Sequence, residues 1–210
     1  VWASDPFALR QEGDKLFGRG TCDMKGFIAA CVAMAPRFAE TARNRPLHMA
    51  FTYDEETGCL GGQALAQRIQ DSGLKPALAI IGEPTGMQVI EGHKGCYEYT
   101  TRFIGLEGHG SGPDWGVNAV EYAVRYVNRL IGLSDQLRDR APDGSRFDPP
   151  WTTINTGALH GGVAHNVIPG TAQVDWEMRP VQRSDADFVK SDIDAYVSDT
   201  LLPAMQAVDP

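Results

Sequence analysis

Two apolar runs in the first part of the chain have the pattern of buried strands. The segment LHMAFTYD alternates apolar and polar residues, which predicts a strand from Leu47 to Tyr53. The segment ALAIIGEP, residues 77–84, is continuously apolar at first, as in a strand buried on both faces. Apolar residues recur at helical spacing from Lys25 to Glu40 and again from Leu60 to Asp71. Strands that alternate with helices predict an α/β layer with a mostly parallel sheet.

The pattern changes after about Gly92, where elements of another type follow. First come a long half-exposed strand (KGCYEYTTRFIG) and an amphipathic helix (VNAVEYAVRYVNRLIGL). A polar loop over residues 134–150 follows, and then two strands (TTINTGALHGG and GTAQVDWEMRP). The last element is a helix that starts with a Ser cap (SDADFVKSDIDAYVSDTLLPAMQ). The order β-α-β-β-α predicts a ferredoxin-like α+β domain, whose last strand we expect beyond Pro210. The sequence therefore predicts two domains, residues 1–91 and 92–210.

Composition and charge exclude several classes of protein. The chain has 210 residues, of which 42% are hydrophobic and 22% charged, as in an ordinary globular protein. A net charge of −8 and the lack of a Lys/Arg cluster argue against a nucleic-acid partner. No apolar run approaches the roughly 20 residues that span a membrane.

The four cysteines form no CxxC pair, which favours free thiols in a reducing cytoplasm. Since the chain has no initiator methionine and opens like mid-domain sequence, we interpret it as an internal fragment.

Acidic residues stand in three short glycine-rich segments, each beside an apolar run. Asp23 lies in GRGTCDMKG, Glu55 and Glu56 lie in YDEETG, and Glu83 lies in IIGEPTG. Ligands of parallel sheets bind beyond the carboxyl ends of the strands, where these acids are expected. Crowded acids are costly unless a cation holds them, and divalent metals bind carboxylate oxygens. The pattern predicts a metal-dependent enzyme.

Simpler interpretations of the same residues stay open. Adjacent Glu55 and Glu56 could split roles at a turn, one as a metal ligand and the other as a base toward water. They could equally form a solvated acidic turn. Asp23 could cap the helix that follows it, which is compatible with metal binding.

Three further residues are candidates for contacts with a substrate. His109 lies in the glycine-rich turn GLEGHGSGPDWG, and Asn166 lies beside His165 in the loop AHNVIP. Arg179 ends a strand before the rigid Pro180, and a fixed guanidinium suits a carboxylate. A loop histidine without a role and a surface ion pair are the alternatives. The sequence contains no GxSxG nucleophile elbow and no P-loop.

Taken together, several motifs resemble one metallopeptidase family along nearly the whole chain. They are GRGTCDMKGFIAA, FTYDEETGCLGG, IIGEPTGMQVIEGHKG, GHGSGPDWGVNAVEYA, INTGALHGGVAHNVIPG and WEMRP. The family is that of acetylornithine deacetylase, succinyl-diaminopimelate desuccinylase and glutamate carboxypeptidase. Within it, GEPT with EGHKG and the DMKGF segment are most similar to acetylornithine deacetylase. That resemblance implies hydrolysis of N-acetylornithine to ornithine and acetate, a step of arginine biosynthesis. Another member of the family, such as a desuccinylase, an N-acyl amino-acid deacylase or a dipeptidase, is the alternative. A non-catalytic dimerisation module is the alternative from a different class.

The resemblance implies two divalent metal ions, usually zinc and sometimes cobalt, in the domain of residues 1–91. Asp23 matches the carboxylate that bridges both ions. Glu56 matches a ligand of one ion, and Glu83 matches a ligand of the other. Glu55 matches the general base.

For residues 92–210 the resemblance implies a lid and dimerisation domain of a cytoplasmic homodimer. His109 matches a lid histidine that reaches the active site of the partner subunit and helps to hold the oxyanion. Asn166 and Arg179 match lid residues that contact the substrate. The family's His-x-Asp motif is expected upstream of Val1 and its last histidine ligand downstream of Pro210. We therefore expect the fragment alone to be inactive.

Overall fold

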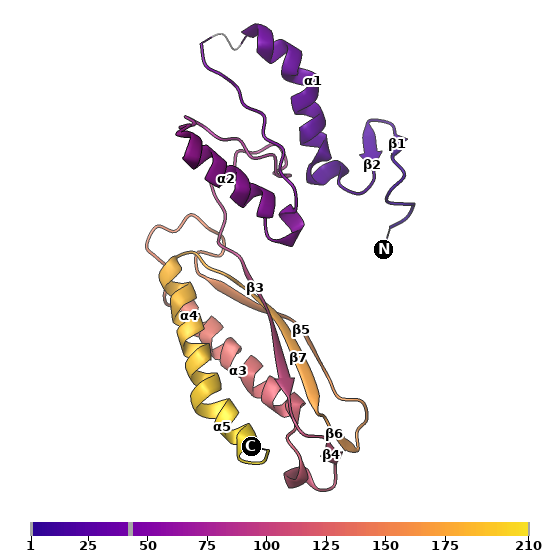
Figure 1. The fold of residues 1–210 in the computed structure, drawn as a ribbon, viewed down its shortest axis with the longest axis vertical. Coiled ribbons are helices and arrows are strands. Elements are labelled where there is room, and N and C mark those ends of the chain that lie inside the picture. The colour runs from indigo at the N-terminus through magenta and orange to yellow at the C-terminus, as the bar shows by residue number, and fades with distance from the viewer. Residues whose placement is uncertain (1, 42–43, 210) are drawn as a thin grey trace. The chain divides into compact units, whose positions relative to one another are not determined.

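The chain divides into two compact units, Val1–Ile90 and Glu91–Pro210, which are drawn in Figure 1. The structure is a computed structural model that describes residues 2–41 and 44–209. Each unit is described by itself. None of the helices in these ranges is long and apolar enough to cross a membrane.

The first unit consists of short elements joined by extended segments. Its elements are β1 (Arg10–Glu12), β2 (Lys15–Phe17), α1 (Gly26–Thr41), the 3-10 turn η2 (Glu55–Thr57) and α2 (Leu60–Ser72). β1 and β2 form an antiparallel hairpin around Gly13, whose positive φ of 57° suits glycine. Both predicted helices are confirmed, and Gly73 with φ 69° ends α2 as a left-handed C-cap.

The mostly parallel sheet predicted for this unit is wrong for the described residues. Residues 47–53 and 77–83 form no strand, and the hairpin is antiparallel. Their large apolar side chains stay between 36% and 77% exposed (Leu47, Met49, Phe51, Tyr53, Leu78, Ile80 and Ile81). A β-strand forms only when a neighbouring strand completes its backbone hydrogen bonds. The pattern of residues within one apolar segment does not show whether such a neighbouring strand is present.

The second unit contains a three-stranded antiparallel sheet with helices on one face. Its strands and long helices, in chain order with α5, are β3 (Tyr97–Ile104), β4 (Gly108–His109), α3 (Ala119–Arg138), β5 (Thr153–Gly161), β6 (Val167–Ile168), β7 (Thr171–Arg179), α4 (Arg183–Tyr196) and α5 (Leu202–Gln206). The strands lie in the order β3-β7-β5. The predicted strands and helices of this unit are present in the predicted order, and the short strands β4 and β6 are additional to the prediction.

Two predicted boundaries in this unit are wrong. α3 continues to Arg138, so the loop predicted from Ser134 begins later. α4 begins at Arg183 with Gln182 as N-cap and no side-chain capping bond, so Ser184 is not the cap. Helix ends depend on tertiary contacts as well as on local sequence, and Leu133 and Leu137 extend the buried face of α3.

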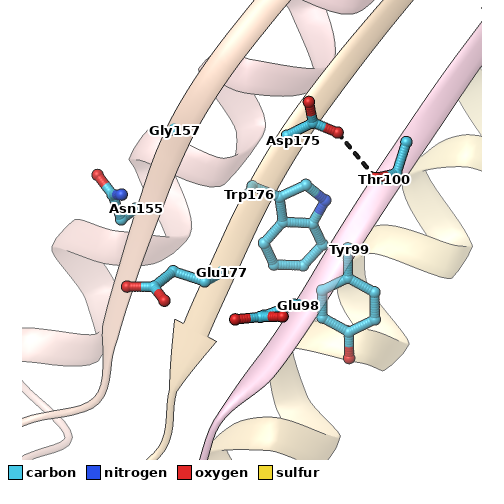
Figure 2. Close-up of a pocket in the computed structure, with 8 residues that line it drawn as sticks. All are labelled: Glu98, Tyr99, Thr100, Asn155, Gly157, Asp175, Trp176 and Glu177. Carbon is cyan, nitrogen blue, oxygen red and sulfur yellow. Dashed lines mark hydrogen bonds between the residues drawn. The ribbon is translucent and has the colours of Figure 1, made fainter. Parts of the chain in front are cut away.

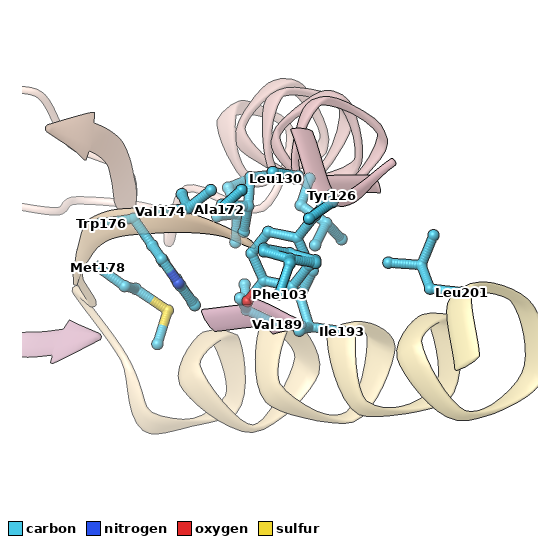
Figure 3. Close-up of a cluster of buried hydrophobic side chains, with 14 of the residues drawn as sticks. Phe103, Tyr126, Leu130, Ala172, Val174, Trp176, Met178, Val189, Ile193 and Leu201 are labelled. Carbon is cyan, nitrogen blue, oxygen red and sulfur yellow. The ribbon is translucent and has the colours of Figure 1, made fainter. Parts of the chain in front are cut away.

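The core of the second unit lies between the sheet and its two long helices. On β7 the alternate residues Ala172, Val174, Trp176 and Met178 are all buried. Figure 3 shows several of them with Tyr126 and Leu130 of α3 and with Val189 and Ile193 of α4. The remaining residues of β7 face the other side of the sheet, because successive side chains of a strand alternate. That open face is polar and ends in Arg179.

A buried carboxylate fixes the chain just beyond Arg179. Asp185 is fully buried and accepts hydrogen bonds from the Thr152 hydroxyl at 2.5 Å and from Arg140 Nε at 3.0 Å. The Thr152 oxygen in turn accepts a hydrogen bond from the Val181 amide at 3.0 Å. These bonds satisfy a charge that would otherwise be costly to bury, and they anchor the segment that follows β7.

Candidate active site

Asp23 lies in a tight turn immediately before α1. The turn follows Gly20, whose φ is 77°, and the Lys25 amide donates to the Gly20 carbonyl at 2.8 Å. Gly20 rather than Asp23 is the N-cap of this turn. The backbone of Asp23 itself is extended, with φ −118° and ψ 98°.

Asp23 and Glu56 line the same pocket in the first unit. The pocket has a volume of about 410 Å³, and Cys22 and Arg19 also contribute to it. Its walls come from Trp2, from β2 with the segment that follows it, and from Glu56 of the turn η2. The structure therefore brings two of the predicted metal ligands to one place.

Glu83 follows a glycine that packs against the Asp23 segment. A Cβ atom at Gly82 would overlap the ring of Phe27 and would lie 2.7 Å from Cε of Met24. Glycine is therefore required at position 82 for this close approach. The contact brings the backbone of the Glu83 segment next to the residues that flank Asp23.

The Glu55–Glu56 pair lies on the 3-10 turn η2. Left-handed residues flank this turn, with Asp54 at φ 54° and Gly58 at φ 105°. Both glutamates are exposed, but only Glu56 lines the pocket described above. Glu55 instead has the Cys59 thiol 3.8 Å from its Oε1. The two side chains therefore have different surroundings.

Ligand atoms close enough together to share a metal ion belong to a different set of residues. Among the described residues, a group that could hold a metal ion is formed by Cys96, Glu98 and Glu177, with ligand atoms within 4.8 Å of one another. Asp23, Glu56 and Glu83 do not form such a group. We did not predict the group from the sequence, since it arises from the register that places Glu98 opposite Glu177.

The positively charged side chain of Arg179 lies beside this group. Arg179 Nη2 donates to Glu177 at 2.9 Å, and Arg179 Nε lies 3.2 Å from both carboxylate oxygens of Glu177. These hydrogen bonds to Glu177 are the largest cause of the raised pKa of Arg179. Arg179 is thus held by an ion pair on the open face of the sheet.

A second pocket, of about 400 Å³, lies on this open face across all three strands (Figure 2). Figure 2 shows Glu98 and Thr100 of β3 beside Asp175 and Glu177 of β7. The Thr100 hydroxyl donates to Asp175 at 2.8 Å, and the Gln173 amide donates at 3.0 Å. These bonds lower the pKa of Asp175, Thr100 being the largest cause.

His109 and Asn166 are brought together by the short strands β4 and β6. His109 pairs with Val167, and the Gly110 amide donates to the Asn166 carbonyl at 2.8 Å. A Cβ atom at Gly110 would lie 3.1 Å from the Asn166 carbonyl carbon, so glycine permits this approach. Arg179 lies at the opposite end of β7 from this pair, about 25 Å away along the strand.

Comparison with known proteins identifies the family. The sequence profile of peptidase family M20/M25/M40 matches residues 1–201. The chain belongs to this family. The curated acetylornithine deacetylases of Klebsiella pneumoniae and Pectobacterium atrosepticum are each 36% identical to it over 205 residues. The match covers 98% of this chain and 51% of each relative, so the chain spans about half the length of these M20-family relatives.

Two solved structures have a similar fold. A tripeptidase from Staphylococcus aureus has a TM-score of 0.56 at 19% identity, over 89% of this chain and 47% of the other. The aminopeptidase PepT from Bacillus cereus has a TM-score of 0.52 at 18% identity, over 90% and 48%. At such identities the likeness concerns the fold. Enzymes of the M20 family are generally metal-dependent.

Proposed function

We propose that the complete protein hydrolyses the amide bond of N-acetylornithine to give ornithine and acetate, a step of arginine biosynthesis. The observation that supports this best is the 36% identity to acetylornithine deacetylases over 98% of the chain. Free cysteines at all four positions are compatible with a cytoplasmic enzyme.

The acids of the first unit are our proposed metal ligands. Asp23 and Glu56 line one pocket and Glu83 follows the glycine packed beside it, and hard carboxylate oxygens fit a divalent cation. Two ions are proposed, with zinc as the first choice and cobalt as the second. When bound, such ions supply Lewis-acid polarisation of the amide carbonyl.

The remaining candidate residues would transfer protons, stabilise the negative charge on the carbonyl oxygen, or bind the substrate. Glu55 accepts the proton of the attacking water as the new C–O bond forms, and it returns a proton to the amine when the C–N bond breaks. His109 donates a hydrogen bond to the oxygen that becomes negative, and Arg179 binds the substrate carboxylate. Asn166, next to His109, contacts the substrate.

The second unit is our proposed lid and homodimerisation domain, with a ferredoxin-like fold. The antiparallel order β3-β7-β5 leaves β3 as an edge strand, which could pair with the sixth element of that fold. Because His109 and Arg179 lie at opposite ends of β7, one lid cannot easily bring both to the same substrate. This separation supports a dimer in which His109 serves the active site of the partner.

Acetate release from N-acetylornithine by the metal-loaded complete protein tests the proposal. Chelation should abolish release, and zinc or cobalt should restore it. Glu55→Gln should bind metal normally but lower kcat by about 10²- to 10⁴-fold, the usual contribution of a general base. Glu121→Gln, at an exposed position on α3, is the matched control and should leave kcat unchanged.

Two other results would overturn parts of the proposal. Activity restricted to other N-acyl amino acids or peptides would keep the amide hydrolysis but exclude N-acetylornithine as the substrate. Self-association without metal uptake or hydrolysis would favour a dimerisation module.

A further inference from the structure

We propose that Ser111 is a positioning residue for His109, which orients the imidazole and, in its neutral form, selects the tautomer with the proton on Nε2. The inference deepens the proposed function, because it assigns the form in which His109 acts. Ser111 itself contacts neither the reacting atoms nor the metal ligands in this scheme.

The hydroxyl and the backbone amide of Ser111 both contact the same ring nitrogen of His109. The hydroxyl Oγ lies 2.7 Å from Nδ1 of His109. The backbone amide of Ser111 also donates to Nδ1, at 3.3 Å. Within the described part of the chain, Nε2 of His109 makes no hydrogen bond, and the side chain is exposed.

The backbone amide favours one tautomer, and the Ser111 hydroxyl strengthens this preference. An amide N–H can only donate, so Nδ1 must present a lone pair. A proton on Nδ1 would place two N–H groups against each other. In the neutral imidazole the proton therefore lies on Nε2, and the Ser111 hydroxyl donates to Nδ1 as well.

The position of Ser111 does not depend on its own side chain. The Gly112 amide donates to the His109 carbonyl at 3.0 Å, which closes a turn with Ser111 inside it. The next turn closes between the Trp115 amide and the Gly112 carbonyl at 2.9 Å. On the other side, β4 pairs with β6 and Gly110 bonds to Asn166. Removal of the hydroxyl should therefore leave the loop in place.

This tautomer suits a donor to an oxyanion. Nε2–H points away from Ser111, since Nδ1 and Nε2 lie on different sides of the ring. A donor fixed before the substrate binds needs no reorganisation when charge develops on the carbonyl oxygen. Ser111 thus reduces the freedom of a ring that burial does not restrain.

The tautomer is measured directly by long-range ¹H–¹⁵N NMR of the 210-residue chain labelled at its five histidines. His109 is assigned by comparison with His109→Gln. We expect a protonated Nε2 and an unprotonated Nδ1. Ser111→Ala should add a measurable fraction of the Nδ1–H form, whereas Ser111→Thr, which keeps the hydroxyl, should not. A protonated Nδ1 in the wild-type chain would overturn the inference, whether or not the protein is a deacetylase.

Kinetics of the metal-loaded complete protein give the second test. Ser111→Ala should lower kcat about five-fold with little change in KM, as expected for one hydrogen bond, and Ser111→Thr should restore it. In a His109→Gln background the same substitution should have no further effect, because Ser111 acts only through His109. Ser191→Ala, at an exposed position of α4, is the control. Additive losses in the double variant would mean that Ser111 acts by another route.

Discussion

Single side chains on the open face of the sheet are held by hydrogen bonds and charges rather than by burial. Glu177 is bound by Arg179 of the same strand, and Asp175 is bound by Thr100 and Gln173. Each contact joins residues that a strand places on one face, two positions apart or directly across the sheet. The face is therefore ordered although it is exposed.

Asp175 makes the pH dependence of this face testable. Its pKa is lowered in the folded state, so its ionised form stabilises the fold above the unfolded pKa of about 3.9, and this stabilisation disappears as pH falls through the folded pKa. Asp175→Asn should therefore reduce the free energy of unfolding at pH 7, and the difference from wild type should shrink as pH falls below about 4. Urea unfolding at several pH values measures it. Asp135→Asn, on the exposed face of α3, is the control, and an equal pH-independent loss would contradict the assignment.

At the scale of elements, α3 has two faces of different kinds. One face is fully buried against the sheet through residues such as Ala123, Leu130 and Leu137. Val124 and Ile131 lie seven residues apart on another face and are 53% and 56% exposed. α3 packs on β5, which is an edge strand of the sheet. An exposed apolar stripe beside a free strand edge suits the isologous contact of the proposed homodimer.

The double substitution Val124→Glu and Ile131→Glu should convert the proposed dimer to monomers. Two charges from each subunit would be buried at a two-fold contact without partners. Sedimentation velocity gives the oligomeric state, and circular dichroism verifies that the helices remain. Gln136→Glu, an exposed position on the same helix, should leave the dimer intact. A dimeric double variant would place the interface elsewhere.

At the scale of the whole molecule, the two units differ in how much apolar surface they bury. The buried hydrophobic residues of the described chain all fall between Phe103 and Leu201, in the second unit. In the first unit the buried residues among those described are Gly61 and Gly82. Hydrophobic burial is the main favourable term in folding, so the second unit has the larger share of stability within this chain.

Hydrogen exchange of the 210-residue chain should show this difference directly. Amides of residues 47–53 and 77–81 belong to no strand or helix and should exchange close to the rate of an unfolded chain. Amides of β7, which is paired on both sides, should be protected most strongly. Mass spectrometry of peptic peptides separates the two groups. Comparable protection of residues 47–53 and β7 would mean that the apolar run is paired in solution.

The pattern of residues along the chain determined the local elements and the candidates for chemistry. Helical spacing predicted α1, α2 and α3 with errors at their ends, alternation predicted β3, and the sequence also predicted the strands β5 and β7. These features depend on neighbours within a few residues, which is why they can be read from periodicity. The motifs likewise indicated the family, whose profile matches residues 1–201.

Tertiary structure alone decided which of these parts meet. It left residues 47–53 without a strand partner, placed Asp23 with Glu56 in one pocket, and set Glu98 opposite Glu177. It also directed Ser111 onto one nitrogen of His109. Strand register, the convergence of carboxylates and the choice of a tautomer depend on contacts between distant segments or on the path of a turn. Composition and spacing do not contain that information, because many pairings are compatible with the same local pattern.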